Sequence, residues 1–124
     1  MKASLTLIVI GLLSFWLAQS VQAEQARFDQ LNSKAVQLYG EGKYDEAVTA
    51  GEEALKLAEE TLHPGDKDLI VVLENLAASY VGAKKPDQAK ATYERILTLK
   101  DQDPATSPAS KARTLYSLGI VGID

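Results

Sequence analysis

The side chains with catalytic potential are few in this 124-residue sequence. His63 is the single histidine and cysteine is absent, and no glycine-rich phosphate loop or nucleophile elbow is present. A metal site needs several converging donors. Because His63 precedes Pro64 at the end of an expected helix, we expect it to lie in solvent there. The sequence therefore predicts no enzyme activity, metal or cofactor.

Carboxylates occur as adjacent pairs, Glu52-Glu53 and Glu59-Glu60. Neighbouring residues on a helix do not face each other, so these pairs diverge and are expected to form a solvated face rather than an acid–base couple. The absence of cysteine also excludes disulfides, thiolate metal sites and a lipid anchor on cysteine.

Charge is distributed unevenly along the chain. Residues 24–68 carry 11 acidic and 5 basic side chains, whereas residues 69–124 carry 6 acidic and 7 basic ones. Nucleic-acid binding requires a basic face, so it is not expected here. The acidic half is interpreted as a solvated helix face, with a basic ligand as the alternative.

The N-terminus has the organisation of a secretory signal. A basic start at Lys2 is followed by an uncharged apolar stretch of 13 residues, Leu5 to Leu17. Val21 and Ala23 then place small residues before Glu24, which predicts cleavage between Ala23 and Glu24. The expected organisation is a signal peptide over residues 1–23 and one domain over residues 24–124.

An uncleaved membrane anchor is the alternative for this segment. The apolar stretch is shorter than the roughly 20 residues that span a bilayer. It becomes long enough if residues 18–23 continue the helix.

An internal repeat organises the rest of the chain. Similar residues recur at a constant offset of 42 positions: Leu31 with Leu73, Ala47 with Ala89, and Leu55 with Leu97. A second step of 42 reaches Leu115. The sequence therefore contains two repeats and the first helix of a third.

Each repeat has apolar residues spaced three and four apart, which predicts amphipathic helices. Pro86 suits the first turn of a helix, and Ser107-Pro108 combines an N-cap with a proline start. We expect helices over residues 25–40, 43–62, 67–82, 86–100 and 108–122, and thus an all-α fold.

These residues resemble the tetratricopeptide repeat. The pattern is carried by one unit: Ala35, Leu38, Tyr39, Gly42, Tyr44, Glu46 and Ala47, then Ala54 and Leu55. The resemblance implies a solenoid of helical hairpins, with repeats over about 28–62 and 70–103 and a partial repeat over 110–124. The 42-residue period is similar to that of the kinesin light chain subgroup, although this chain has Asp66-Lys67 where that subgroup has His-Pro.

The resemblance further implies a concave groove that binds a peptide or helix of a protein partner. Its walls would be the first helices of the hairpins: Asn32, Val36 and Tyr39; Glu74, Asn75, Ala78 and Val81; and Arg113, Tyr116 and Ile120. Asn75 matches a position that contacts ligand backbone in many members, and the alternative is a bond to a neighbouring helix. A carboxylate clamp is not expected, because Asn32 and Val36 replace its lysine and asparagine.

The third repeat has no second helix in this sequence. Its open apolar side is expected to pack against a second copy, to dock a partner, or to continue into a longer array. The sequence as a whole predicts a non-catalytic scaffold of the bacterial periplasm or exterior. A membrane-anchored assembly factor is the alternative.

Overall fold

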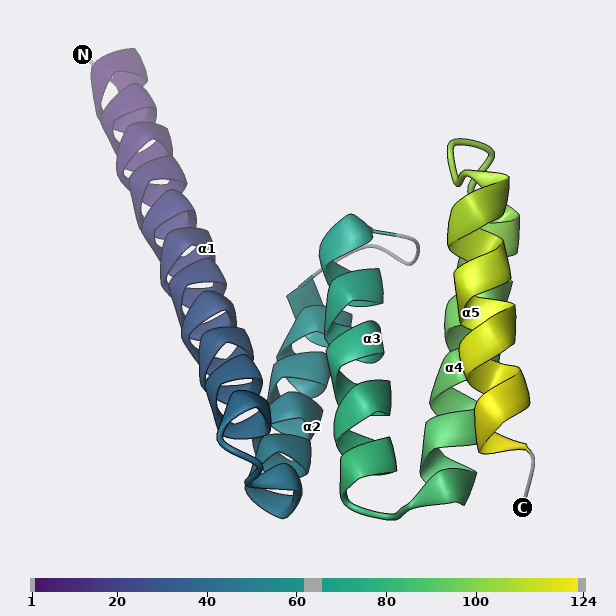
Figure 1. The fold of residues 1–124 in the computed structure, drawn as a ribbon. Coiled ribbons are helices and arrows are strands. Elements are labelled where there is room, and N and C mark those ends of the chain that lie inside the picture. The colour runs from purple at the N-terminus through teal and green to yellow at the C-terminus, as the bar shows by residue number, and fades with distance from the viewer. Residues whose placement is uncertain (1, 62–65, 123–124) are drawn as a thin grey trace.

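The computed structural model describes residues 2–61 and 66–122, and all regular structure within them is helical (Figure 1). The helices are α1 (Lys2–Gly40), α2 (Tyr44–Thr61), α3 (Lys67–Gly82), α4 (Pro86–Gln102) and α5 (Pro108–Val121). The all-α prediction is confirmed, and apart from the start of α1 the predicted helix ends agree within two residues. His63 and Pro64 lie outside the described residues.

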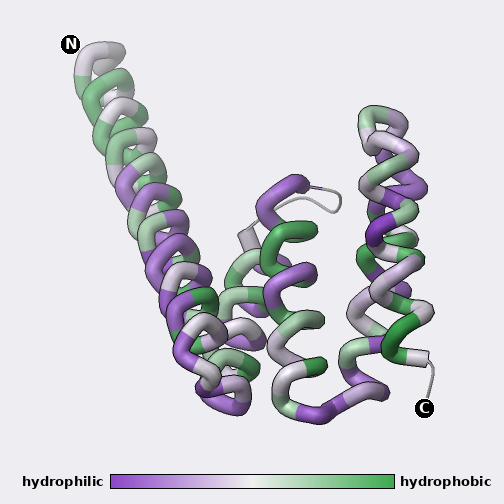
Figure 2. The backbone as a smooth tube through the Cα atoms, viewed as in Figure 1, coloured by the Kyte–Doolittle hydropathy of each residue, from purple (hydrophilic) through white to green (hydrophobic). Residues whose placement is uncertain are grey.

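Helix α1 begins at Lys2 rather than near residue 25 as expected. The reason is local, since residues 2–24 contain no proline and are rich in helix-forming leucine and alanine. Its N-terminal half is apolar and exposed (Figure 2). By length and composition, α1 is the one described helix that is able to cross a membrane. A signal sequence and an anchor both predict such a helix, and Ala23-Glu24 lies inside it.

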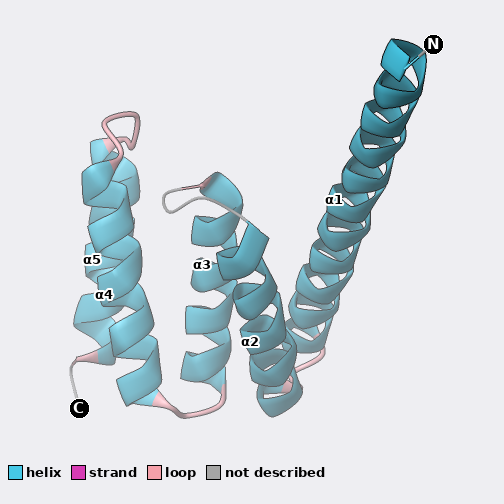
Figure 3. Ribbon diagram, turned by 180° about the vertical axis from the view of Figure 1, so that it is seen from behind, coloured by secondary structure: helices cyan, strands magenta, loops and turns pink. Residues whose placement is uncertain are grey.

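The helices pack in chain order, each against the next, and α1 also contacts α3. Figure 1 shows α3 in front of α2 and α5 in front of α4, and the view from behind in Figure 3 shows α2 in front of α3. Such an arrangement places the first helix of each hairpin in one layer and the second helix in the other, which is the stack of hairpins that the repeat predicted.

Alanines occupy the closest contacts between the layers. Ala47, Ala54, Ala77 and Ala89 have no exposed surface. Larger residues fill the spaces between these contacts, with Leu73, Leu76, Ile96 and Val72 as the largest fully buried side chains. The alanines of the repeat pattern are thus buried between the helices.

The turns inside the two hairpins are built alike. Gly42 has φ +75° and Lys84, 42 residues later, has φ +60°. The backbone hydrogen bonds around them correspond one to one: Lys43 N to Leu38 O and Lys85 N to Tyr80 O, both at 2.9 Å. The repeat therefore extends to backbone geometry, although the second turn places a lysine in the left-handed region that favours glycine.

The predicted helix starts are also present. Ser107 caps α5 by accepting a hydrogen bond from the Ser110 amide at 3.2 Å, and Pro108 follows in the first turn. Pro86 occupies the first turn of α4. At both places proline costs little, because its missing N–H would have no partner within the helix.

Candidate partner-binding groove

The first two walls of the expected groove meet between α1 and α3. Val36 and Tyr39 of α1 and Asn75 and Ala78 of α3 line a hollow of about 60 Å³. Val36 and Tyr39 are nearly half exposed. This hollow and its four predicted residues, called the α1–α3 groove below, present apolar surface beside an amide.

The amide of Asn75 crosses this groove. Its Nδ2 donates to Oδ1 of Asn32 at 3.4 Å, joining α3 to α1. The distance exceeds the usual range of 2.7–3.2 Å, so the bond is weak. Asn75 thus makes the helix-to-helix contact that was the alternative to ligand binding, at the edge of an accessible hollow.

Between α3 and α5 the surface is more open. Glu74 and Arg113 are two predicted groove residues that share a hollow of about 180 Å³, with Tyr93 of α4 also in its lining. Toward the start of both helices lies a hollow of about 360 Å³ that includes Lys67. These hollows form a slot beside α5, called the α3–α5 slot below.

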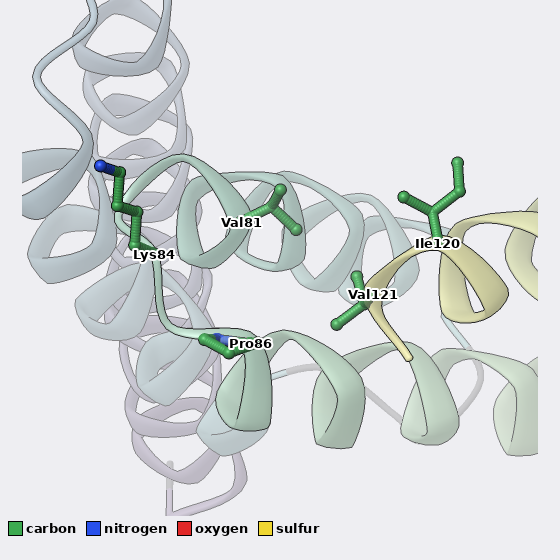
Figure 4. A pocket seen from close by; sticks show the side chains of 5 residues that line it. All are labelled: Val81, Lys84, Pro86, Ile120 and Val121. Atoms are coloured by element: carbon green, nitrogen blue, oxygen red, sulfur yellow. The ribbon is translucent and has the colours of Figure 1, made fainter. Parts of the chain in front are cut away.

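A third hollow of about 430 Å³ lies at the C-terminal ends of α3 and α5. Val81, Lys84 and Pro86 line one side, and Ile120 and Val121 line the other (Figure 4). It is mainly aliphatic and is called the C-terminal hollow below. It brings together Val81 and Ile120, which the sequence placed in separate walls.

Glu74 has a structural partner that the sequence analysis did not identify. Its Oε1 lies 2.7 Å from Nζ of Lys100, whose side chain is almost fully buried. Lys100 also donates to Oγ1 of Thr114 at 2.9 Å, and it lies 3.4 Å from the Ser110 carbonyl oxygen. A single ammonium group therefore connects α3, α4 and α5.

A signal for Lys100 was present in the sequence. It lies 42 residues after Ala58, which is fully buried in the first hairpin. A lysine at a core position of the repeat indicates a buried charge, which needs paired and hydrogen-bonded partners.

The lysine and arginine side chains at the slot differ in their partners. Lys100 is paired with Glu74, whereas Lys67 and Arg113 have no ion-pair partner among the described residues. Of the acids, Asp103 accepts a hydrogen bond from the Ala105 amide. The slot therefore presents unpaired positive charge, although the whole chain is acidic.

Two tyrosines beside the site are perturbed by their surroundings. Burial, together with the 2.7 Å hydrogen bond to Glu52, raises the pKa of Tyr80 to about 12. Burial also raises the pKa of Tyr93, against a lowering effect of its hydrogen bond to Ser117. Both phenols are thus neutral near pH 7, and neither is a candidate base.

The remaining predicted groove residue, Tyr116, is 72% exposed and lines none of these hollows. Among the described residues no group of three or more acidic or histidine side chains is placed to hold a metal ion. The site is thus a surface of shallow hollows along the first helices of the hairpins.

One comparison with known proteins gives a match. A family model described as tetratricopeptide repeat matches residues 30–102, which spans α3 and α4 and most of the first hairpin. No curated protein and no solved structure matches the chain.

Proposed function

Because the chain belongs to the tetratricopeptide repeat family, we propose that it is a non-catalytic scaffold of the bacterial cell envelope. Repeats of this family generally mediate protein–protein interaction. The proposed ligand is an extended or helical segment of a partner protein, bound across the α1–α3 groove and the α3–α5 slot. The long second helices, 18 residues in α2 and 17 in α4, support the proposed likeness to the kinesin light chain subgroup.

The observation that carries this proposal is the composition of the α1–α3 groove. Tyr39 is an exposed aromatic side chain, and aromatic anchors dominate many protein interfaces. Asn75 beside it is able to donate and accept hydrogen bonds, and it gives up only a weak bond to Asn32 when it turns to a ligand. An apolar anchor with an adjacent amide suits a peptide backbone of varied sequence.

Site-specific photocrosslinking in living cells tests the groove. A benzophenone amino acid replaces Tyr39 in the full chain, and a matched control replaces Lys56, which is exposed on α2. We expect a discrete adduct with another protein from position 39 alone, weakened when Asn75→Ala is added. The same adducts from both positions, or none from position 39, would contradict the proposal.

Export is supported by the exposed apolar half of α1. We propose cleavage after Ala23, which releases residues 24–124 into the periplasm or the exterior. The continuous helix favours a second candidate, a membrane-anchored assembly factor that retains residues 1–23.

Mass spectrometry of the protein from fractionated cells decides between these two candidates. An N-terminus at Glu24 in the soluble fraction supports export, and an intact N-terminus in the membrane supports the anchor. Trp16 is the single tryptophan, so cleavage also removes tryptophan fluorescence.

A further inference from the structure

The C-terminal hollow corresponds, by the 42-residue repeat, to a place in the first hairpin that an aromatic pair fills. In the first hairpin Tyr39 and Tyr44 pack edge to face, with ring centroids 5.5 Å apart. A side chain at Gly82 would collide with the Tyr44 ring, so this ring fills the space between the start of α2 and the end of α3. Residues 42 positions later are Val81 and Pro86, which leave the corresponding space open. The hollow therefore occupies a position that a tyrosine ring fills in the first hairpin.

A largely exposed tyrosine stands one helical turn away. Tyr116 is 72% exposed, and Ile120, four residues later on the same face, lines the hollow. Between them, a Cβ at Gly119 would meet nothing within 4 Å. The same helix thus carries a projecting ring and one wall of a hollow suited to a ring.

This spacing is self-complementary. When two α5 helices pack antiparallel about a two-fold axis near Leu118, position 116 of one faces position 120 of the other. Each tyrosine then reaches the partner's hollow, as a two-fold interface requires. From Thr114 to Gly122 no residue is charged, which matches the depletion of charge at interface cores.

We propose that the protein pairs with a second copy through α5, with Tyr116 of each copy seated in the C-terminal hollow of the other. This pairing is separate from the α1–α3 groove and leaves that groove accessible. The pairing buries Leu115, Tyr116 and Ile120 on both copies, and these residues are 51%, 72% and 53% exposed in the single chain.

Cysteine crosslinking tests the axis, because the chain has no cysteine of its own. Gly119→Cys places a thiol near the axis, where we expect rapid disulfide dimerisation of the full chain in mild detergent. Ala109→Cys is the matched control on the same helix, since its two copies lie about 27 Å apart at 1.5 Å per residue. Equal crosslinking at both positions would mean random collision and would overturn the proposal.

The fit of the ring into the hollow is tested in the Gly119→Cys background. We expect Tyr116→Ala to reduce crosslinking at least tenfold and Tyr116→Phe to preserve it. Val81→Tyr with Pro86→Tyr rebuilds the aromatic pair of the first hairpin, fills the hollow and should abolish crosslinking in a variant that circular dichroism shows to be folded. Unchanged crosslinking in Tyr116→Ala, or in a folded variant with the hollow filled, would overturn the proposal. Photocrosslinking from position 39 reports on the α1–α3 groove and thiol crosslinking from position 119 reports on α5, so the two proposals are tested by separate measurements.

Discussion

The ammonium nitrogen of Lys100 lies 2.9 Å from the hydroxyl oxygen of Thr114, the one residue of α5 that is buried among the described residues. The packing of α5 thus centres on a polar contact rather than an apolar one. Lys100 of α4 also pairs with Glu74 of α3. The position of α5 as a wall of the α3–α5 slot therefore depends on this ion pair between α3 and α4.

The two partners of this ion pair differ in exposure, so their removal should have unequal effects. Glu74→Ala leaves the buried ammonium of Lys100 without a counter-charge, which should cost about 2–3 kcal/mol of unfolding free energy. Lys100→Met leaves a carboxylate that water reaches, since the Glu74 side chain is 41% exposed, and should cost about 1 kcal/mol or less. Urea denaturation of both variants measures this difference, and a larger loss in Lys100→Met would contradict it.

The second hairpin turn is expected to be strained at Lys84. Its φ of +60° is unfavourable for a residue with a Cβ by about 1–2 kcal/mol. Lys84→Gly should raise the unfolding free energy by about 0.5–1 kcal/mol, because the gain exceeds the greater flexibility of glycine in the unfolded chain. Gly42→Ala at the matching turn should lower it. Thermal melts of the two variants that shift in the same direction would refute the correspondence of the turns.

The contact at Ala89 should not accept a larger side chain. Ala89 has no exposed surface, and Ala89→Leu should lower the unfolding free energy by about 1–3 kcal/mol through overpacking. Ala91→Leu, on the exposed side of the same helix, is the control and should change it little. Circular dichroism melts of the pair are sufficient, and equal melting temperatures would count against the close helix contact.

Alkaline pH should destabilise the protein through Tyr80. Its pKa in the folded protein is about 12, compared with about 10 in an unfolded chain. The folded state therefore retains the phenol proton more tightly, and this stabilisation is present below pH 10 and is lost as the pH rises from about 10 to 12.

Tyr80→Phe removes both the hydrogen bond to Glu52 and this titration. The variant should be less stable by about 1 kcal/mol at pH 8, with a shallower loss of stability above pH 10. Urea denaturation between pH 8 and 11.5 gives both values. Parallel pH profiles for the two proteins would show that Tyr80 titrates normally.

The repeat made most of the fold predictable from the sequence. The 42-residue offset aligned Leu31 with Leu73 and Ala47 with Ala89, and helix periodicity with proline positions placed the helix ends. The start of α1 differs from the prediction, because a cleavage pattern carries no information on where a helix begins and residues 2–24 contain no helix-breaking proline.

The candidate site was less predictable than the fold. The sequence placed Val36, Tyr39, Asn75 and Ala78 on facing walls, and the structure brings them around one hollow. It did not predict that Glu74 pairs with Lys100, since that contact depends on which side chain reaches across three helices. The C-terminal hollow exists because Val81 and Pro86 are smaller than Tyr39 and Tyr44, their counterparts in the first hairpin. This difference in filled space is apparent only when the two hairpins are compared in three dimensions.

Helix α1 continues from Lys2 to the first wall of the groove without a break. If the apolar end of α1 is held in a translocation channel or in a lipid bilayer, the orientation of the repeats depends on the number of residues between that end and the groove. Each residue inserted between Ala23 and Phe28 would rotate the stack by about 100° and lift it by about 1.5 Å. In the anchored candidate, in which residues 1–23 are retained, the number of residues in this short stretch would therefore set the direction in which the groove faces relative to the membrane.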